Sequence, residues 1–187
     1  MLFIELSIDM IYVSINNPAS IAERKKMADN QTFEIIFEAN AVAVGKMRND
    51  IEVSWPKMQE TFSLATDEGA FHGGDGTAPP PLALFAAALC GCLMTQIRAF
   101  AKRMRLSLDG LQLSSKFHWQ GETTPSNLYE TQPIEFEIII HIESSNDQER
   151  IIELITAAKL GCFIEQSLSK DFPIKHYVVH NGESIEI

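Results

Sequence analysis

The sequence predicts an α+β fold in which largely antiparallel sheets pack around a long central helix, with a second helix that carries a cysteine. Three observations support it. Segments of alternating or β-branched residues stand before and after one long apolar segment, residues 81–104. Prolines open that segment and basic residues close it, as in a helix. A second helical pattern ends at Gly161, directly before Cys162.

Length and charge limit the domain count and the partners. A chain of 187 residues, 45% hydrophobic and 21% charged, suits one folded domain. The formal net charge of −10 and the lack of a Lys/Arg run argue against nucleic acid, whose phosphates need a basic surface. An acidic surface also disfavours anionic membranes. We therefore expect a small neutral or apolar substrate.

The first 26 residues form an appendage to a single domain over residues 27–187. Apolar residues in this segment alternate, which predicts a strand, and also recur at helical spacing, which predicts a helix. The segment carries Glu5 and Asp9 and lacks the basic start of a signal peptide. We expect a cytoplasmic protein, in which disulfides are transient.

The domain begins with three predicted strands, residues 32–44, 51–55 and 60–65, rich in β-branched and aromatic residues. Polar residues such as 48–50 are expected to form the turns between them, which gives an antiparallel meander. The glycines and prolines of residues 71–81 then form a loop that leads into the central helix.

The central helix is predicted over residues 81–104. It is apolar nearly all round as far as Met94, so we expect its first half to be buried. Its apolar run approaches the length of a membrane span, but it opens with three prolines and soon reaches Gln96 and Arg98. A core helix of the domain fits this pattern better.

The second half of the chain continues with strands and a second helical region. Strands are predicted within residues 106–119 and 133–143. A helix with an apolar stripe follows, capped by a Ser or Asn and ended by Gly161. Residues 163–168 form a short further helix. Strands at residues 176–180 and 184–187 close the chain.

Two cysteine segments resemble a known family. In PPPLALFAAALCGC a proline opens the helix, a leucine follows three residues later, and small residues precede Cys92. The segment AAKLGCFIEQSL places Cys162 at a helix end before a short helix. Both segments, with the GGDG loop before the helix, resemble the OsmC/Ohr family (osmotically inducible protein C and organic hydroperoxide resistance protein), in its OsmC-like branch. The resemblance runs from Thr32 to the C-terminus. The matched residues of the first segment are Pro81, Leu84, Ala87, Ala88 and Gly91.

The resemblance implies a thiol-dependent peroxidase that reduces organic, fatty-acyl type hydroperoxides. Cys92 would attack the peroxide and become a sulfenic acid, and Cys162 would condense with it to a disulfide. An external dithiol, of the lipoyl type, would reduce that disulfide, and no cofactor is implied. The family also implies a homodimer with shared active sites. Arg48 matches the family's catalytic arginine, with Lys46 as the alternative cation.

One departure from the family opens a second interpretation. Hydroperoxide-reducing members carry a glutamate directly after the proline, where this chain has Leu82. The alternative is therefore a dimer of the same fold that senses redox state or binds an apolar ligand, with little peroxidase turnover. Cys90 points about 200° away from Cys92 on a helix, so the two cannot share a pocket, and Cys90 is interpreted as a core thiol.

Phe85, Leu89 and Phe163 are candidates to line an acyl-sized pocket, with core packing as the alternative for each. The histidines include no close pair at metal-ligand spacing, and Cys-Gly-Cys within a buried helix is poor geometry for zinc. We therefore expect no metal site.

Overall fold

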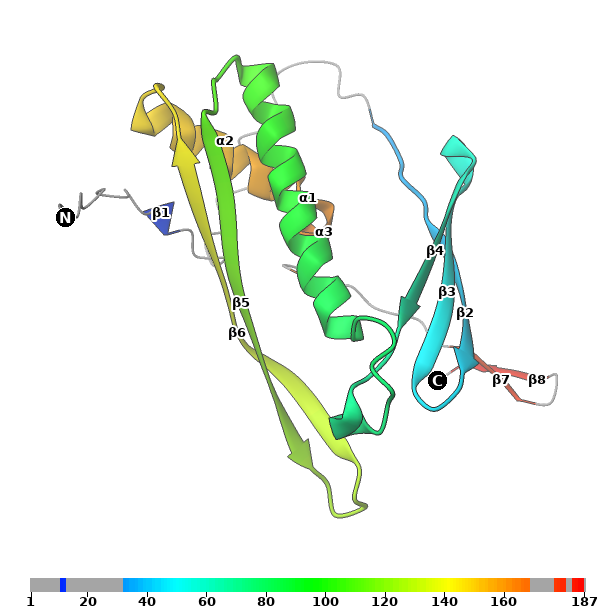
Figure 1. The fold of residues 1–187 in the computed structure, drawn as a ribbon. Coiled ribbons are helices and arrows are strands. Elements are labelled where there is room, and N and C mark those ends of the chain that lie inside the picture. Colours follow the sequence, from blue (N-terminus) through cyan, green and yellow to red (C-terminus); the bar gives the residue numbers. More distant parts are fainter. Residues whose placement is uncertain (1–10, 13–31, 169–176, 181–182, 187) are drawn as a thin grey trace. The chain divides into compact units, whose positions relative to one another are not determined.

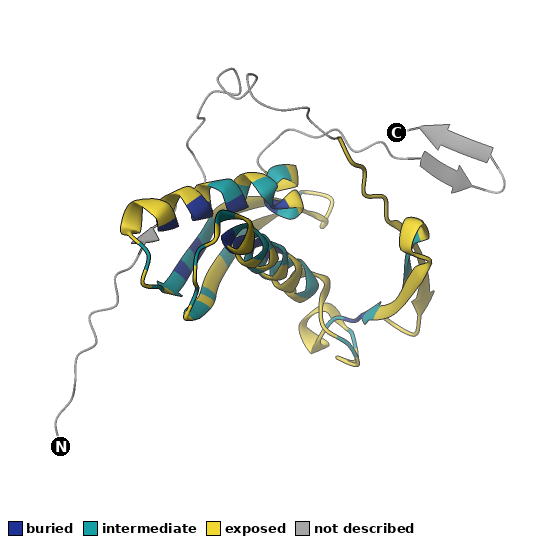
Figure 2. Ribbon diagram, turned by 90° about the horizontal axis from the view of Figure 1, so that it is seen from above, coloured by how far each residue is buried: buried dark blue, intermediate teal, exposed yellow. Residues whose placement is uncertain are grey.

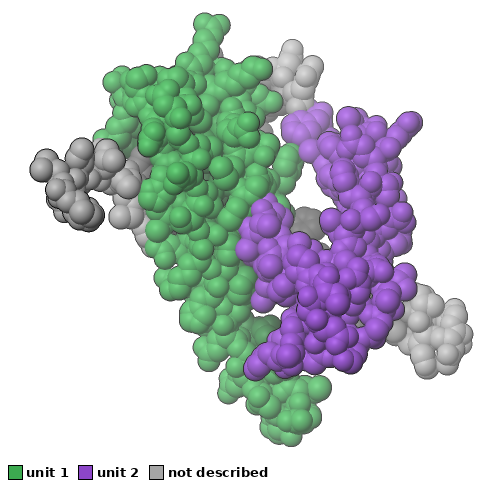
Figure 3. Space-filling view, in the orientation of Figure 1, with its two compact units in different colours: residues 1–15, 89–187 green, residues 16–88 purple. Residues whose placement is uncertain are grey.

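The computed structural model describes residues 11–12, 32–168, 177–180 and 183–186. Its helices and antiparallel sheets make the α+β fold that the sequence predicts. The chain divides into two compact units (Figure 3). The first joins Met1–Ile15 to Leu89–Ile187, and the second is Asn16–Ala88.

The unit of residues 16–88 contains an antiparallel meander in the order β2-β3-β4, as predicted. The prediction that residues 48–50 form a turn is wrong: Gly45 adopts a φ of 68° and begins the turn, so that Arg48 already pairs with Val44. The polar residues 48–50 begin strand β3 instead. The strands are β2 (Glu38–Val44), β3 (Arg48–Trp55) and β4 (Glu60–Thr66), with short 3-10 turns at Pro56–Met58 and Ala70–His72.

Helix α1 spans Pro81–Met104, the range that the sequence predicts. Its first position is a proline, whose missing N–H costs nothing there. At the other end Arg105 takes a left-handed φ of 57°, and the N–H of Leu106 donates to the carbonyl of Ala101 at 2.9 Å. These are the bonds of a Schellman motif, with arginine in the position that glycine usually takes.

The other unit is built on a second antiparallel sheet in the order β1-β6-β5 (Figure 1). Its main strands continue further than predicted, as far as a turn in which Asn127 has a φ of 63°. The first strand pairs Ile11 with Ile140, so this part of the appendage is a strand, and the rest of residues 1–26 lies outside the described residues. The strands are β1 (Ile11–Tyr12), β5 (Gly110–Thr123) and β6 (Tyr129–Glu143), and a separate hairpin joins β7 (Tyr177–His180) to β8 (Glu183–Glu186).

The second helical region consists of α2 (Gln148–Gly161) and α3 (Phe163–Leu168), as predicted except that Asp147 occupies the N-cap of α2. Gly161 ends α2 and lies against α1. A Cβ atom there would come 2.6 Å from Cζ of Phe100, so glycine lets the two helices approach closely. This approach sets the position of Cys162.

The hydrophobic core lies between α1, α2 and β6 (Figure 2). Helix α1 contributes residues at a spacing of four, which places them on one stripe. Two isoleucines of β6 and the apolar stripe of α2 face it, and Cys162 completes the cluster. The buried residues are Leu89, Leu93, Ile97, Ala101, Ile138, Ile140, Ile151, Leu154, Ile155, Ala158 and Cys162.

The prediction that the first half of α1 is buried is wrong for the single chain. Leu82 is 54% exposed, and Ala87 and Ala88 are also exposed. The stripe that begins at Leu89 faces β6 and α2, whereas Leu82, Ala87 and Ala88 are exposed among the residues that the structure describes. By length and hydropathy α1 could also span a membrane. This is weak evidence for a membrane span, because core helices of soluble proteins share both properties.

Candidate functional site

The structure brings Cys92 and Cys162 together. Cys92 stands in the middle of α1, partly buried and packed against the core. Cys162 lies between α2 and α3 and is fully buried. The side chains of the two residues are hydrogen-bonded, and all cysteines of the chain are free thiols. The pair is therefore placed for reversible thiol–disulfide chemistry.

The two thiols are not equivalent. Burial is the largest of the causes that raise the pKa of Cys162 to about 12, from an ordinary value of 9.0. The side-chain interaction with Cys92 raises the pKa of Cys162 further, and so do the charges of Cys92 and Glu165. The backbone N–H of Glu165 donates to Cys162 Sγ and lowers the pKa. Cys162 therefore keeps its proton at neutral pH.

Cys162 is expected to resist alkylation in the folded protein. With its pKa raised to about 12, the thiolate population at pH 8 is about a thousandfold below that of an ordinary thiol. Iodoacetamide at pH 8, followed by peptide mass spectrometry, should label Cys92 first and Cys162 only after unfolding in urea. Equal labelling rates of Cys162 in folded and unfolded protein would contradict this. Because the pKa is raised on folding, stability should fall as the pH rises from about 9 to about 12.

Glu165 belongs to the same site, although it is not among the site residues that the sequence predicts. Its side chain is only 4% exposed, and it lies in the first turn of α3, three residues after Cys162. Burial raises the pKa of its carboxyl group, and the charge of Lys159 partly opposes that shift. A cysteine followed three residues later by a glutamate at a helix start has the spacing of a capping box. That spacing was the available signal.

Cys90 has a different environment from Cys92. Its Sγ lies 3.2 Å from Oγ of Ser115 on β5, within hydrogen-bonding distance. It is half-buried and is not among the core residues. The spacing of two residues on α1 turns Cys90 toward the sheet, while Cys92 contacts Cys162.

The three candidate pocket residues differ in exposure. Leu89 is 1% exposed and belongs to the core. Phe85 is half-buried, and Phe163 is 48% exposed at the start of α3. Among the described residues no group of three or more His, Cys, Asp or Glu side chains could hold a metal ion.

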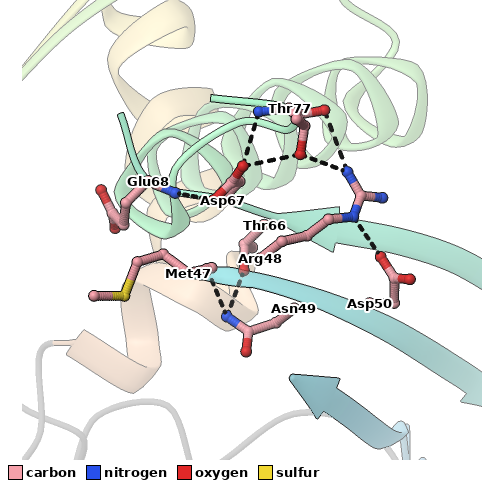
Figure 4. A network of polar contacts seen from close by, with 8 residues as sticks. All are labelled: Met47, Arg48, Asn49, Asp50, Thr66, Asp67, Glu68 and Thr77. Carbon is pink, nitrogen blue, oxygen red and sulfur yellow. Dashed lines mark hydrogen bonds and ion pairs between the residues drawn. The ribbon is translucent and has the colours of Figure 1, made fainter. Parts of the chain in front are cut away.

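Arg48 lies in the unit of residues 16–88, where a polar network holds its guanidinium group (Figure 4). Nε donates to Asp50 Oδ1 at 2.8 Å, and Nη1 donates to the hydroxyl of Thr77 at 3.0 Å. The same hydroxyl donates to Oδ2 of Asp67 at 2.8 Å. Thr77 thus links the cation to a buried carboxylate.

Asp67 is 2% exposed and is held as a carboxylate. The backbone N–H of Thr77 is the largest cause that lowers the pKa of Asp67, and burial opposes it. The hydroxyl of Thr77, the N–H of Glu68 and the charge of Arg48 lower the pKa further. Lys46, the alternative cation, instead pairs with Asp75 at 2.6 Å, and both side chains are largely exposed.

The loop that carries Thr77 depends on Gly74. A Cβ atom at this position would lie 1.9 Å from the carbonyl oxygen of Glu68, a contact that backbone atoms cannot accommodate. Gly74→Ala is expected to displace the loop, separate Thr77 from Asp67, and lower the free energy of unfolding by about 1–3 kcal/mol. Urea unfolding measures the change. Gly69→Ala is the matched control, because a Cβ atom there meets nothing within 4 Å; equal stability of the two variants would contradict the prediction.

Comparisons with known proteins agree with this geometry. The chain matches the family described as OsmC-like protein over residues 74–176. A crystal structure of an OsmC-like hydroperoxide resistance protein from Jannaschia sp. CCS1 is 44% identical, has a TM-score of 0.57, and covers 82% of this chain and 98% of its own. An OsmC-like protein from Mycoplasma pneumoniae shares the fold at 18% identity, with a TM-score of 0.53 and coverage of 73% and 89%. No curated protein sequence matches the chain. The chain belongs to the OsmC-like protein family.

Proposed function

We propose that this protein is a thiol-dependent peroxidase that reduces organic, fatty-acyl type hydroperoxides. Membership of a family that includes hydroperoxide resistance proteins supports a peroxidase-like or stress-related role. The observation that carries the finer proposal is the hydrogen-bonded pair of Cys92 and Cys162. Two thiols in contact, one of them held protonated, suit a cycle in which one attacks and the other resolves.

In the proposed cycle the Cys92 thiolate attacks the terminal peroxide oxygen. The O–O bond breaks, the alcohol leaves with a proton, and Cys92 becomes a sulfenic acid. The sulfur of Cys162 then forms the disulfide as the S–O bond breaks and water leaves. An external dithiol of the lipoyl type reduces the disulfide and restores both thiols.

The thiol of Cys162 also supports the first step. In the proposed cycle the protonated Cys162 thiol donates a hydrogen bond to the attacking sulfur of Cys92. The attacking residue lies deep in α1, where the N-terminal dipole has faded, so a nearby donor matters more than the helix end.

Arg48 is the proposed cation of this site. A guanidinium group offers several N–H donors to an anionic sulfur and a peroxide oxygen. Asp50 and Thr77 fix its orientation through bonds of 2.8 and 3.0 Å, the task that a glutamate in place of Leu82 performs in relatives with that residue. Lys46 is the weaker candidate because it pairs with Asp75 in an exposed position.

We also propose that the protein acts as a homodimer with shared active sites. The described part of the unit 16–88 has no buried apolar side chain, although the sheet and the segment before it carry many large apolar side chains. A sheet of this composition needs a covering surface to be stable, and a second copy would supply it. Light scattering should then give twice the chain mass of 20.9 kDa. The exposed side chains include Phe33, Ile36, Phe37, Val42, Phe62 and Leu64.

The substrate pocket is proposed to be apolar. Phe85 on α1 and Phe163 on α3 are the accessible candidates, and the third candidate, Leu89, is buried in the core. An apolar pocket favours alkyl or acyl hydroperoxides over hydrogen peroxide, because burial of the substrate's alkyl chain contributes about 0.8 kcal/mol of binding free energy per CH₂ group.

The proposed function is tested by following cumene hydroperoxide consumption with dihydrolipoamide as the reductant. Turnover, together with a mass loss of two hydrogens and a linked peptide pair containing Cys92 and Cys162, is the expected result. Hydrogen peroxide is the matched substrate control and should be reduced more slowly. An inert protein in which no such bond forms would favour the redox-sensing or ligand-binding alternative.

A further inference from the structure

The first turn of α3 has a cysteine in the place of a helix cap. Cys162 has an extended backbone, with φ −77° and ψ 109°, and its carbonyl accepts the first helical bond, from the N–H of Gln166 at 2.9 Å. Its Sγ accepts the N–H of Glu165. Cys162 therefore occupies the N-cap, and Glu165 occupies the third helical position.

The second half of a capping box is missing. In that motif the glutamate side chain accepts the backbone N–H of the cap residue. Here the N–H of Cys162 donates to the carbonyl of Lys159 at 3.3 Å instead. Oε2 of Glu165 is buried without a hydrogen-bond partner among the described residues.

A buried carboxylate oxygen without a hydrogen-bond partner lowers the stability of a folded protein. Capping does not account for Glu165, because its carboxyl group is not used in the cap. The position of Glu165 beside Cys162 suggests another use for the carboxyl group. The backbone N–H of Glu165 contacts Cys162 Sγ, and its carboxylate charge acts on that thiol. A proton acceptor is also what Cys162 requires, since the thiol keeps its proton at neutral pH and a thiol attacks as the thiolate.

We propose that the carboxyl group of Glu165 relays the proton of Cys162 when the disulfide with Cys92 forms and when it is reduced. The inference rests on the proposed peroxidase cycle. As Cys162 Sγ attacks the Cys92 sulfenic acid, its proton passes to the Glu165 carboxylate. The S–S bond forms, the S–O bond breaks, and the same proton joins the departing hydroxide as water. On reduction a dithiol sulfur attacks Cys92, the S–S bond breaks, and a proton released by the dithiol passes through the Glu165 carboxylate to the departing Cys162 sulfur.

The electrostatic surroundings suit this task. Burial raises the pKa of Glu165, which makes its carboxylate a stronger proton acceptor than an exposed one. The titratable groups that act on the site are Lys159 of α2, Cys162 itself and Cys92 of α1. The charge of Lys159 opposes this shift and favours the ionised carboxylate.

The test measures disulfide formation in a single turnover. Reduced protein is mixed with one equivalent of cumene hydroperoxide between pH 5.5 and 9, quenched with acid, and analysed by intact mass. Glu165→Gln should slow the conversion of sulfenic acid to disulfide about a hundredfold, without changing the rate at which the sulfenic acid appears. The variant's rate should rise tenfold per pH unit, whereas the wild-type rate should reach a plateau.

The matched control is Glu153→Gln. Glu153 lies on α2 in an exposed ion pair with Arg150, far from any role in the proposed cycle, and its variant should keep the wild-type rate and plateau. Relay by Glu165 is overturned if Glu165→Gln and wild type share one pH profile. A wild-type rate that rises tenfold per pH unit over the whole range overturns it as well, whatever the variant does.

A second oxidant separates this inference from the peroxidase proposal. Oxidised glutathione converts Cys92 to a mixed disulfide, from which Cys162 then displaces glutathione with the same loss of a proton. If hydroperoxide leaves wild type unoxidised but Glu165→Gln slows glutathione release, the peroxidase proposal fails and the relay stands. If hydroperoxide is consumed while Glu165→Gln matches wild type with both oxidants, the relay fails and the peroxidase proposal stands.

Thermal unfolding excludes a merely structural effect. The raised pKa means that folded protein binds the Glu165 proton more tightly than unfolded protein, so burial of this group reduces stability as the pH rises above 4.5. Glu165→Gln should therefore melt no lower than wild type at pH 8, and its advantage should shrink toward pH 4. Slow disulfide formation in a Glu165→Gln variant that is fully folded supports the relay. A Glu165→Gln variant that melts lower than wild type at pH 8 counts against a buried charge at Glu165, and the relay depends on that charge.

Discussion

Cys92→Ser is expected to lower the rate of organic hydroperoxide consumption by roughly a thousandfold or more. The attacking atom must be an ionised sulfur, and a serine hydroxyl remains protonated at neutral pH. Loss of the nucleophile removes the covalent step altogether, which in other enzymes has effects of this size or larger. The fold should survive, because the residue is only partly buried and the two side chains have similar shapes. Consumption of cumene hydroperoxide under excess dithiol measures the loss.

Cys90→Ser is the matched control, two residues away on the same helix. Its Sγ contacts Oγ of Ser115 rather than Cys162, and a serine can keep that hydrogen bond. Turnover within about twofold of wild type is expected. If instead Cys90→Ser is inactive and Cys92→Ser is active, the assignment of the attacking thiol is wrong.

The helix boundaries were predictable because local chemistry decides them. Pro81 fits only the first turn of a helix, and Gly161 marks the point where α2 meets α1. The exposed first half of α1 was not predictable in this way. Sequence reveals which residues are apolar but not which of several apolar faces a neighbouring element covers.

The turn before β3 illustrates a second limit. Gly45 supplies the left-handed torsion, and Arg48–Asp50, which are polar enough for a turn, form the start of a strand instead. Their side chains have a polar task, since Arg48 bonds Asp50 and Thr77. Propensity describes the average use of a residue, and a buried or functional network overrides it.

The candidate site was predictable only through resemblance. No spacing rule predicts that Cys92 and Cys162, some seventy residues apart in the sequence, lie together. The tertiary packing of α1 against α2 brings them together. Glu165 was hidden for a related reason. A glutamate in the first turn of a helix is ordinary on its own, and only its burial beside a thiol makes it notable.

Cys162→Ser is expected to convert sustained turnover into a single event. The first equivalent of hydroperoxide should still be consumed, because Cys92 is intact, but the sulfenic acid then has no second thiol in contact with it. The steady-state rate with dihydrolipoamide should fall about a hundredfold or more, since the missing step was effectively unimolecular. Burst kinetics at several protein concentrations, with dimedone to trap the sulfenic acid, measure both effects.

Folding of this variant should be preserved, which makes the result interpretable. Serine is among the preferred N-cap residues, and its hydroxyl can accept the N–H of Glu165 that Cys162 Sγ now accepts. The variant also loses the thiol donor next to Cys92, so the burst itself should be slower than in wild type. A burst larger than one equivalent, or steady turnover at the wild-type rate, would mean that the dithiol reduces Cys92 directly. Cys162 would then serve to tune the attacking thiol through its hydrogen bond, and the peroxidase cycle would need only one cysteine.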